Sequence, residues 1–504
     1  MSDTLTQQQL ESYLWGAATI LRGLVDAGDY KQLIFPLVFF KRLSDVWDED
    51  YARALAGYDG AEELAKAEAD ERFKVPEGAH WDQVRAVSSD VGRAIQDAMR
   101  AIEAANPDRL DSIFGDAPWT NKDRLPDRTL KNLLEHFSTQ TLSIARVPED
   151  SLGDGYEYLV GKFADDGGST AQEFYTNRTL VHLMAQLLQP KAGESIYDPT
   201  CGTGGMLLSA LAEVKRAGGE HRTLKLYGQE RNHMTASIAR MNLVLHGVED
   251  FDIQRGDTLD RPVFTEGDRL RTFDVVLANP PYSIKRWNRE AWASDAWGRN
   301  FLGTPPQGRA DYAFFQHILK SMDPNTGRCA ILFPHGVLFR KQEAEMRRGL
   351  IDADLVECVL GLGPELFFNS AMESCVVFCR SQKPESRKRQ IIFIDAVEEI
   401  ERGRASSLLR PHHQQKIRDA YEAFDDVPGF AKVATLDEVA AQAHSLSIPL
   451  YVKRRTTERV ITLVERPLYE IWADLEQDGR EFWHQMDVLS DVLDGLLNKE
   501  VANG

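Results

Sequence analysis

The sequence predicts an α/β fold: a doubly wound, Rossmann-like sheet between a helical amino-terminal domain and a helical carboxyl-terminal extension. Two observations predict it. Short apolar segments alternate with helical patterns between about residues 195 and 380. Residues from about 5 to 140 instead repeat apolar side chains at helical spacing, with no strand pattern among them. From these changes of pattern we expect domains at residues 1–147, 148–405 and 406–504.

Length, charge and cysteine content exclude several classes of protein. At about 150 residues per domain, 504 residues predict roughly three domains. The net charge of -19 disfavours a free-standing, non-specific nucleic-acid binder, because phosphate neutralisation needs positive surface. The longest apolar run, 33–40, falls short of the roughly 18 residues that cross a bilayer, and the amino terminus lacks a secretory signal. Five cysteines without CxxC pairs predict no disulfide framework and no metal site, and indicate the reducing cytoplasm.

The individual elements can be placed along the chain. Apolar runs predict strands at 195–198, 224–230, 251–254, 273–280, 329–334 and 376–380. Residues 147–155 contain the proline and glycine residues that are typical of a linker. The basic run 383–390 favours a solvated hairpin loop over a DNA contact. Strand patterns fade after about residue 405. The final stretch has the a/d spacing of a coiled coil, whose partner helix comes from another chain or from this one, at Leu475, Phe482, Met486, Leu489, Leu493 and Leu496.

A glycine-rich loop follows the first predicted strand. The strand ends at Tyr197 and leads into DPTCGTGG, residues 198–205, and then into an apolar helical pattern. Glycines at such a turn let the backbone approach a ligand closely, but the GxGxxG pattern of a pyrophosphate site is missing. Asp198 instead offers a carboxylate to a positively charged amine, and the amino terminus of the helix can face an acid group. Considered alone, the loop is equally well an ordinary turn.

Two further acids follow the next two strands. Glu230 ends the second strand, where a carboxylate can accept both hydroxyls of a ribose, although taken singly it would more often be a surface carboxylate. Asp257 follows the third strand and can accept a hydrogen bond from the exocyclic amine of an adenine. Ribose, amine and adenine together indicate S-adenosylmethionine rather than NAD.

The most specific pattern is Asn279-Pro280-Pro281-Tyr282, at the end of a predicted strand. The exocyclic amine of a base is a poor nucleophile, because its lone pair is delocalised into the ring. If the Asn279 side-chain oxygen and the Pro280 carbonyl both accept from that amine, they favour a pyramidal nitrogen whose lone pair faces a methyl sulfonium. The prolines fix the corner, and Tyr282 can stack on a base rotated out of the duplex. The alternative is a Pro-Pro turn that merely ends a strand.

The order of these motifs resembles a known family. FYT at 174–176, then DPTCGTGG, then NPPY resemble the gamma-type adenine-N6 DNA methyltransferases, and the segments 29–45, 303–319 and 446–452 resemble modification subunits of type I restriction-modification systems. The resemblance implies transfer of a methyl group from S-adenosylmethionine to N6 of adenine in double-stranded DNA. It also implies two modification subunits on one specificity subunit that recognises the DNA sequence, with a separate restriction subunit for cleavage.

The resemblance extends to single residues. In the family the FYT-like segment packs on the methionine end of the cofactor, which carries over to Glu173, Phe174, Tyr175, Thr176 and Arg178. Asn177 stands where the family usually has Pro, which leaves the loop less rigid without removing a contact group. The other expected cofactor contacts, from the residues and from the resemblance together, are Asp198, Thr200, Gly202, Thr203, Gly204, Gly205, Glu230 and Asp257.

The segment after NPPY combines basic and aromatic residues. It holds Lys285, Arg286, Arg289, Arg299 and Arg309, interleaved with Trp287, Trp292 and Trp297. Such residues beside a flipped base suit DNA backbone contact and stacking, and the alternative is a lid whose tryptophans pack on the sheet. Phe367 and Phe368 wall the base pocket or, more readily, belong to the core.

Two other functions are compatible with these motifs. One is methylation of another amine: cytosine N4, an RNA base or a protein glutamine. The other is a catalytically silent scaffold that holds DNA or partner chains, against which Asn279, Tyr282 and Glu230 argue.

Overall fold

The computed structural model describes residues 4–26, 29–166, 177–282, 284–364, 366, 374–402 and 407–453. Residues 1–453 belong to one compact unit. The predicted coiled-coil positions between 475 and 496 lie outside the described residues, so that pattern stays a prediction. Among the described residues, every helix is too short or too polar to cross a membrane.

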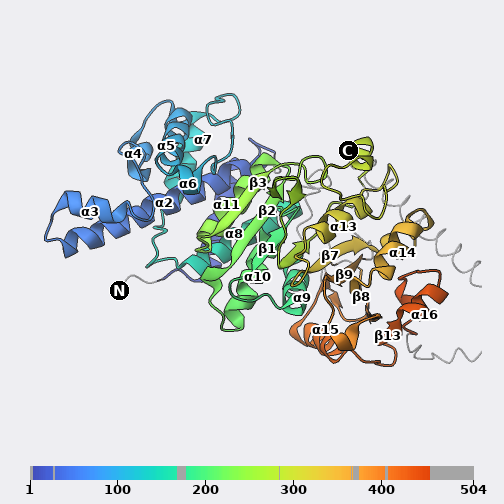
Figure 1. Ribbon diagram of the computed structural model, residues 1–504. Coiled ribbons are helices and arrows are strands. Elements are labelled where there is room, and N and C mark those ends of the chain that lie inside the picture. The colour runs from blue at the N-terminus through green and yellow to red at the C-terminus, as the bar shows by residue number, and fades with distance from the viewer. Residues whose placement is uncertain are drawn as a thin grey trace, which may run out of the picture. The chain divides into compact units, whose positions relative to one another are not determined.

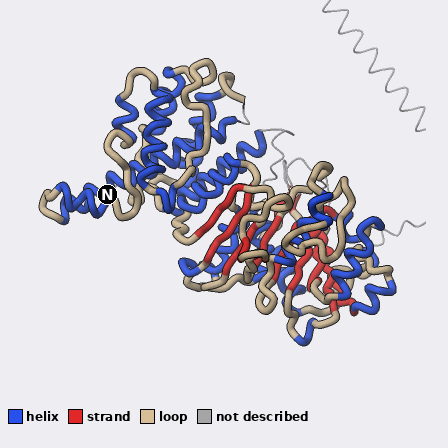
Figure 2. Tube along the Cα trace, turned by 45° about the horizontal axis from the view of Figure 1, so that its top comes forward, coloured by secondary structure: helices blue, strands red, loops and turns tan. Residues whose placement is uncertain are grey.

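The amino-terminal region is helical, as predicted (Figure 1). The apolar run 33–40 lies in the amino-terminal half of the longest of these helices, where its side chains are buried. The core of this region continues into the sheet domain through Met234, Ile238 and Met241. Figure 2 shows the helices of this region beside the red strands of the sheet. The helices are α1 Gln7–Leu21, α2 Tyr30–Gly57, α3 Glu62–Ala69, α4 Trp81–Ala86, α5 Val91–Ala105, α6 Pro107–Leu110 and α7 Asp127–Phe137.

The predicted linker at 147–155 is wrong, because residues Glu149–Asp166 form helix α8. The two glycines that suggested a turn are small residues at helix contacts. A Cβ atom on Gly153 would overlap the ring of His246, and one on Gly155 would lie 2.9 Å from Cδ1 of Leu14. Glycine therefore marks close packing here and not a break in the helix.

The sheet is mostly parallel, as the predicted fold class requires. Its strands are β1 Ser195–Asp198, β2 Lys225–Glu230, β3 Phe251–Arg255, β6 Val275–Ala278, β7 Arg328–Pro334, β8 Val356–Leu362, β9 Ser374–Arg380, β10 Gln390–Ala396 and β13 Ala431–Thr435. Their order is β13-β10-β8-β9-β7-β6-β1-β2-β3. β9 runs antiparallel to β7 and β8, and β13 antiparallel to β10. The short pairs β4 Thr265–Glu266 with β5 Arg269–Leu270, and β11 Glu401–Arg402 with β12 Ser407–Leu408, lie outside it.

Helices cover both faces of the sheet, so it is doubly wound. One face packs on α9 Arg178–Leu188, α10 Gly205–Arg216, α11 His233–Leu245 and α15 Pro411–Ala423. The other packs on α13 Asp311–Lys320, α14 Ala344–Asp352 and α16 Leu436–Ala441. The remaining elements are α12 Arg289–Ala293 and the 3-10 turns His221–Thr223, His335–Leu338, Lys341–Glu343, Glu385–Arg387 and Ile448–Leu450.

Two local predictions in the second half are wrong. Residues 383–390 do not close a hairpin, because β9 and β10 lie on opposite sides of β8. Nor is this run freely solvated: the buried Lys383 donates from Nζ to Asp354 at 2.6 Å, and Arg387 donates to Glu357 at 3.1 Å. Strands also continue past residue 405, because β13 adds an edge strand whose half-polar sequence, AKVAT, gives little pattern. The predicted domain boundaries themselves stay predictions.

The helix α8 contact gives a test of the fold. Gly153→Val is expected to destabilise the protein by about 2 kcal/mol, because the new side chain meets the His246 ring in a packed interface. Chemical denaturation measures the loss. Gly57→Ala is the matched control, since a Cβ there meets no atom within 4 Å and no stability should be lost. Equal stability of Gly153→Val and the wild type would contradict the helical packing of α8.

Candidate active site

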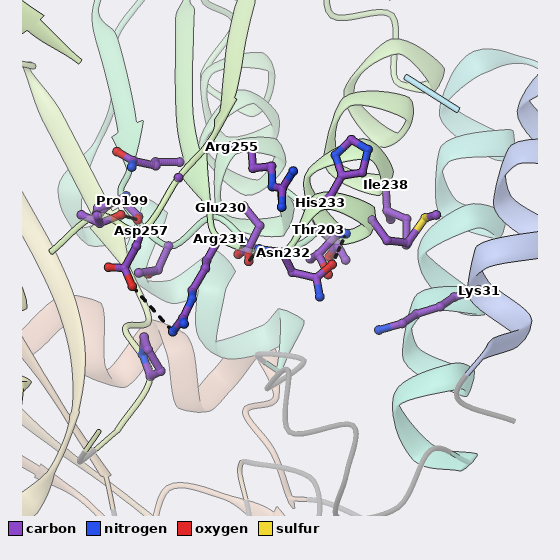
Figure 3. Close-up of a pocket in the computed structure, with 18 of the residues that line it drawn as sticks. Lys31, Pro199, Thr203, Glu230, Arg231, Asn232, His233, Ile238, Arg255 and Asp257 are labelled. Atoms are coloured by element: carbon purple, nitrogen blue, oxygen red, sulfur yellow. Dashed lines mark hydrogen bonds and ion pairs between the residues drawn. The ribbon is translucent and has the colours of Figure 1, made fainter. Parts of the chain in front are cut away.

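A cavity of about 1070 Å³ lies at the carboxyl ends of β1, β2, β3 and β6 (Figure 3). The strand order reverses between β1 and β6, because the chain passes from β1 to β2 and β3 on one side and returns to β6 on the other. Ligands of doubly wound sheets bind at such a reversal. A smaller cavity of about 80 Å³ lies next to it, and Thr200, Gly202, Thr203 and Asn279 line both.

The glycine loop is bent tightly around the end of β1. The Thr200 amide donates to Oδ1 of Asp198 at 3.0 Å, and the Gly204 amide donates to the Cys201 carbonyl at 2.8 Å. Gly202 and Gly204 have φ of +54° and +84°, the left-handed region that glycine adopts at no steric cost. A Cβ on Gly202 would meet nothing within 4 Å, because this residue faces the open cavities. Helix α10 then begins at Gly205.

Asp198 is a buried acid with an altered proton affinity. Only 2% of the residue is exposed, and this burial raises the pKa of its carboxyl to about 7. The hydrogen bond from the Thr200 amide opposes the rise, and the nearby Glu230 carboxylate adds to it. Asp198 lines the smaller cavity, where Arg178 also lies, ion-paired with Glu157. A cationic group placed in this cavity would offset the cost of burying the charged carboxylate.

The two other acids line the larger cavity. Glu230 accepts from the backbone amides of Gly202 at 3.1 Å and Asn232 at 2.7 Å. Asp257 accepts at Oδ1 from the amide of Leu259, and its Oδ2 lies 3.6 Å from Nη1 of Arg231, as the dashed line in Figure 3 marks. The three predicted acids thus stand on three consecutive parallel strands or directly after them.

NPPY begins directly after β6, which ends at Ala278. Asn279 lines both cavities and Pro281 lines the larger one, beside Ile284 and Phe314. Pro280 is buried, and the half-buried Tyr282 packs against the apolar core. Burial raises the pKa of Tyr282 well above its usual value, so its phenol stays neutral.

The structure brings most of the predicted cofactor residues together. Those that line the cavities are Arg178, Asp198, Thr200, Gly202, Thr203, Gly205, Glu230 and Asp257. The side chain of Asn177 instead caps α9, accepting from the Thr179 amide at 3.0 Å and donating to the Ser407 carbonyl at 2.9 Å. Gly204, Pro280 and Tyr282 are near without lining either cavity. Glu173, Phe174, Tyr175, Thr176, Phe367 and Phe368 lie outside the described residues.

The segment after NPPY divides into an exposed and a buried part. Lys285 and Arg286 are exposed, and their contact with DNA stays a prediction. Trp292 and Arg299 are 2% and 1% exposed, and Trp292 packs with Leu259 and Phe314 and not on a strand of the sheet. Within the described ranges, no cluster of three or more His, Cys, Asp or Glu side chains is arranged to hold a metal ion.

The helical region contributes a wall of the cavity that sequence reasoning missed. Lys31, Gln32 and Phe35 of α2, together with Asp116 and Pro118, line the larger cavity. Figure 3 shows Lys31 reaching toward it from the side opposite Glu230 and Asp257. Lys31, Gln32 and Phe35 belong to the segment 29–45, but its sequence does not indicate a cavity wall, because tertiary packing of the helical region on the sheet domain brings these residues to the cavity.

Comparison with known proteins identifies the family. The N-6 DNA methylase family model matches residues 147–459, and the HsdM N-terminal domain model matches residues 10–137. The chain belongs to the N-6 DNA methylase family. This methylase is 29% identical to the type I restriction enzyme MjaIX methylase subunit of Methanocaldococcus jannaschii, over 98% of this chain and 89% of that one. It is 30% identical to the type I restriction enzyme HindI methylase subunit of Haemophilus influenzae, over 83% of this chain and 95% of that one.

A solved structure has the same fold. The type I restriction-modification methyltransferase subunit from Streptococcus thermophilus superimposes with a TM-score of 0.79 at 29% identity, covering 89% of this chain and all of that one. The methylase is therefore an S-adenosylmethionine-dependent enzyme that methylates N6 of adenine in DNA. These relatives give no support to another acceptor amine or to a silent scaffold.

Close packing of β2 against the glycine loop gives a second test. Gly228 in β2 pairs with Asp198, and a Cβ there would lie 2.5 Å from Cδ1 of Ile253 and 2.8 Å from Sγ of Cys201. Gly228→Val is expected to displace the glycine loop and weaken S-adenosylmethionine binding by about tenfold or more, as titration calorimetry would measure. Gly308→Ala, in open space, should bind like the wild type. Unchanged affinity of Gly228→Val would contradict the assignment of this loop to the cofactor.

Proposed function

We propose that the two cavities together hold S-adenosylmethionine, with its methionine end at Asp198, its ribose at Glu230 and its adenine at Asp257. The target adenine then enters beside Asn279. One observation carries this proposal: Asn279 lines both the small cavity of Asp198 and the large cavity of Glu230 and Asp257. The side-chain amide of Asn279 therefore lies next to the position that the methyl group would take in a cofactor spanning the two cavities.

The donors and acceptors of the site fit this ligand. Asp198 gains a cationic partner if the α-ammonium lies beside it, which offsets its burial. Glu230 lines the larger cavity, and its two oxygens, which accept from the Gly202 and Asn232 amides, are of the type that accepts the hydroxyls of a ribose. Gly202 leaves open space where a side chain would intrude. When bound, the cofactor supplies an electrophilic methyl group on its sulfonium.

The chain's own residues act on the nucleophile. The Asn279 side-chain oxygen and the Pro280 carbonyl accept the two hydrogens of the adenine amine and orient the nitrogen lone pair. If the amine nitrogen bonds to that methyl carbon, the carbon–sulfur bond would break with its electron pair left on sulfur, and positive charge would develop on the nitrogen. The two oxygens stabilise this charge until one proton leaves for solvent, which gives N6-methyladenine and S-adenosylhomocysteine. Tyr282 offers its ring for stacking on the base.

We infer that the chain works as the modification subunit of a type I restriction-modification complex, with two copies on one specificity subunit and with a restriction subunit where DNA is cleaved. The names of the relatives support this role. The net charge of -19 also favours a partner that provides DNA recognition. The five cysteines are free and buried, which fits the proposed location in the reducing cytoplasm.

The role of Asn279 can be tested by substitution. Asn279→Ala should lower the rate of methyl transfer by a factor of about 100 to 1000, because one of the two oriented acceptors is lost. Cofactor affinity should change little. Transfer of labelled methyl groups to DNA by the reconstituted complex measures the rate, with Asn279→Asp as the variant that keeps an acceptor oxygen. Wild-type transfer by Asn279→Ala would refute the role.

The proton affinity of Asp198 predicts a pH dependence. With a pKa of about 7, the free carboxyl is mostly protonated below pH 7 and must release a proton to pair with an ammonium. Affinity for S-adenosylmethionine should therefore fall by about tenfold per pH unit below that pKa. Calorimetry in buffers of different ionisation enthalpy would detect the released proton. Asp198→Asn should bind weakly at every pH, and a flat wild-type profile would contradict the pairing.

A further inference from the structure

Arg299 is a buried cation that joins two loops of the active site. It lies in the segment after NPPY and is 1% exposed. Its Nη1 donates to the Thr258 carbonyl and its Nη2 to the Leu259 carbonyl, each at 2.8 Å. Nε and Nη2 also donate to Oδ1 of Asp295, at 2.9 and 2.6 Å. The guanidinium thus holds two consecutive carbonyls of the loop after β3 and one carboxylate of its own segment.

The surroundings of the guanidinium fix its orientation. Its Cζ lies 4.6 Å from the ring centre of Trp292 and 5.0 Å from that of Trp297. His317 lies 3.4 Å from Nη1, and its pKa is well below the usual value because of burial and of the Arg299 charge. A neutral imidazole can accept from the guanidinium, whereas a charged one would repel it. Planar stacking and a fork of donors suit arginine and not lysine at this position.

The loop held by Arg299 is the one that carries Asp257. Asp257 accepts from the amides of Leu259 and Asp260 within this loop. The Thr258 hydroxyl donates to the carbonyl of Pro199, which belongs to the glycine loop after β1. Arg299 therefore connects, through Thr258, to the segment around Asp198. Arg299 itself is absent from the lining of both cavities.

The other side of this connection is the segment beside the target base. Trp292 packs with Leu259 and Phe314 in a small core to which Ile284 adds. Asn288 donates to Asp260 at 3.1 Å, a second link between the two loops. Because Ile284 and Phe314 also line the larger cavity, one small core supports both the predicted adenine position of the cofactor and the wall next to Asn279.

We propose that Arg299 is a positioning residue for cofactor binding: it fixes the 257–260 loop against the glycine loop and the post-NPPY segment without touching the cofactor. The inference rests on the proposed function, since it assumes that Asp257 faces the adenine of S-adenosylmethionine. Without the guanidinium, the carbonyls of residues 258 and 259 lose their buried donors, and Asp295 loses its ion-pair partner while it keeps the amides of Trp297 and Arg299. The loop then relaxes, and Asp257 and Thr258 leave their binding positions.

The experiment measures binding and turnover separately. For the full chain, Arg299→Ala should weaken S-adenosylhomocysteine binding by about tenfold or more in titration calorimetry. In the reconstituted complex, KM for S-adenosylmethionine should rise by a similar factor, while KM for DNA changes less. Millimolar guanidinium should restore part of the affinity, because the cavity left between Asp295, two carbonyls and two tryptophan rings is shaped for that ion. Sodium at equal ionic strength is the control for the added salt.

Two variants keep the outcome decisive. Arg289→Ala removes a guanidinium from the same segment. Because Arg289 donates to the Pro305 carbonyl and not to the 257–260 loop, this variant should bind S-adenosylhomocysteine like the wild type. Arg299→Lys keeps the charge, but its single nitrogen cannot reproduce the planar fork that reaches both carbonyls and Asp295, so weak cofactor binding is expected even if the alanine variant fails to fold. If folded Arg299→Lys binds like the wild type, or if KM for the cofactor and for DNA rise equally, the inference is overturned. If the wild type itself binds no cofactor, the proposed function fails instead.

Discussion

The parallel pairing of β1 with β6 is the constraint on which the site depends. Ile196 pairs with Val275 and Tyr197 with Val276, so β1 and β6 end at the same edge of the sheet. Asp198 therefore reaches the cavity region from the end of β1. Asn279 reaches it from the neighbouring strand, directly after the end of β6. The order of the strands reverses at this pair, which leaves room for a ligand between the loops that leave them. The register of the two strands sets the spacing between Asp198 and Asn279, so no direct contact between them is needed to hold them at the same cavity.

Electrostatics then decides which ligand this edge favours. Asp198 is buried next to a second acid, Glu230, so its carboxyl holds a proton unusually tightly. A ligand that brings a positive amine removes this cost, while a pyrophosphate would add to it. The open backbone at Gly202 and the amides that hold Glu230 complete a site for a nucleoside with a cationic tail. In the proposed mechanism the methyl acceptor needs only oriented oxygens, which Asn279 and Pro280 would provide from a corner fixed by two prolines.

The sequence was informative where a pattern is local. The strands β1, β2, β3, β6 and β7 were predicted closely, because each is a short run that ends in a turn. Residues 198, 230, 257 and 279 lie at or just after the ends of β1, β2, β3 and β6. It failed where the meaning of a residue depends on distant packing. Gly153 and Gly155 suggested a linker but lie at helix contacts, and Arg299 suggested a DNA contact but is buried. Lys31 and Asp116 could not be assigned to the cavity at all, since only tertiary structure brings the helical region to the sheet edge.

A structure of the chain with sinefungin bound tests the account most directly, because this analogue of S-adenosylmethionine carries an amine in place of the transferable methyl. The account predicts that its α-ammonium lies against Asp198, its ribose hydroxyls against Glu230, and the substituted amine opposite the side-chain oxygen of Asn279. A ligand bound away from the ends of β1 and β6, or bound there with that amine turned away from Asn279, would contradict it.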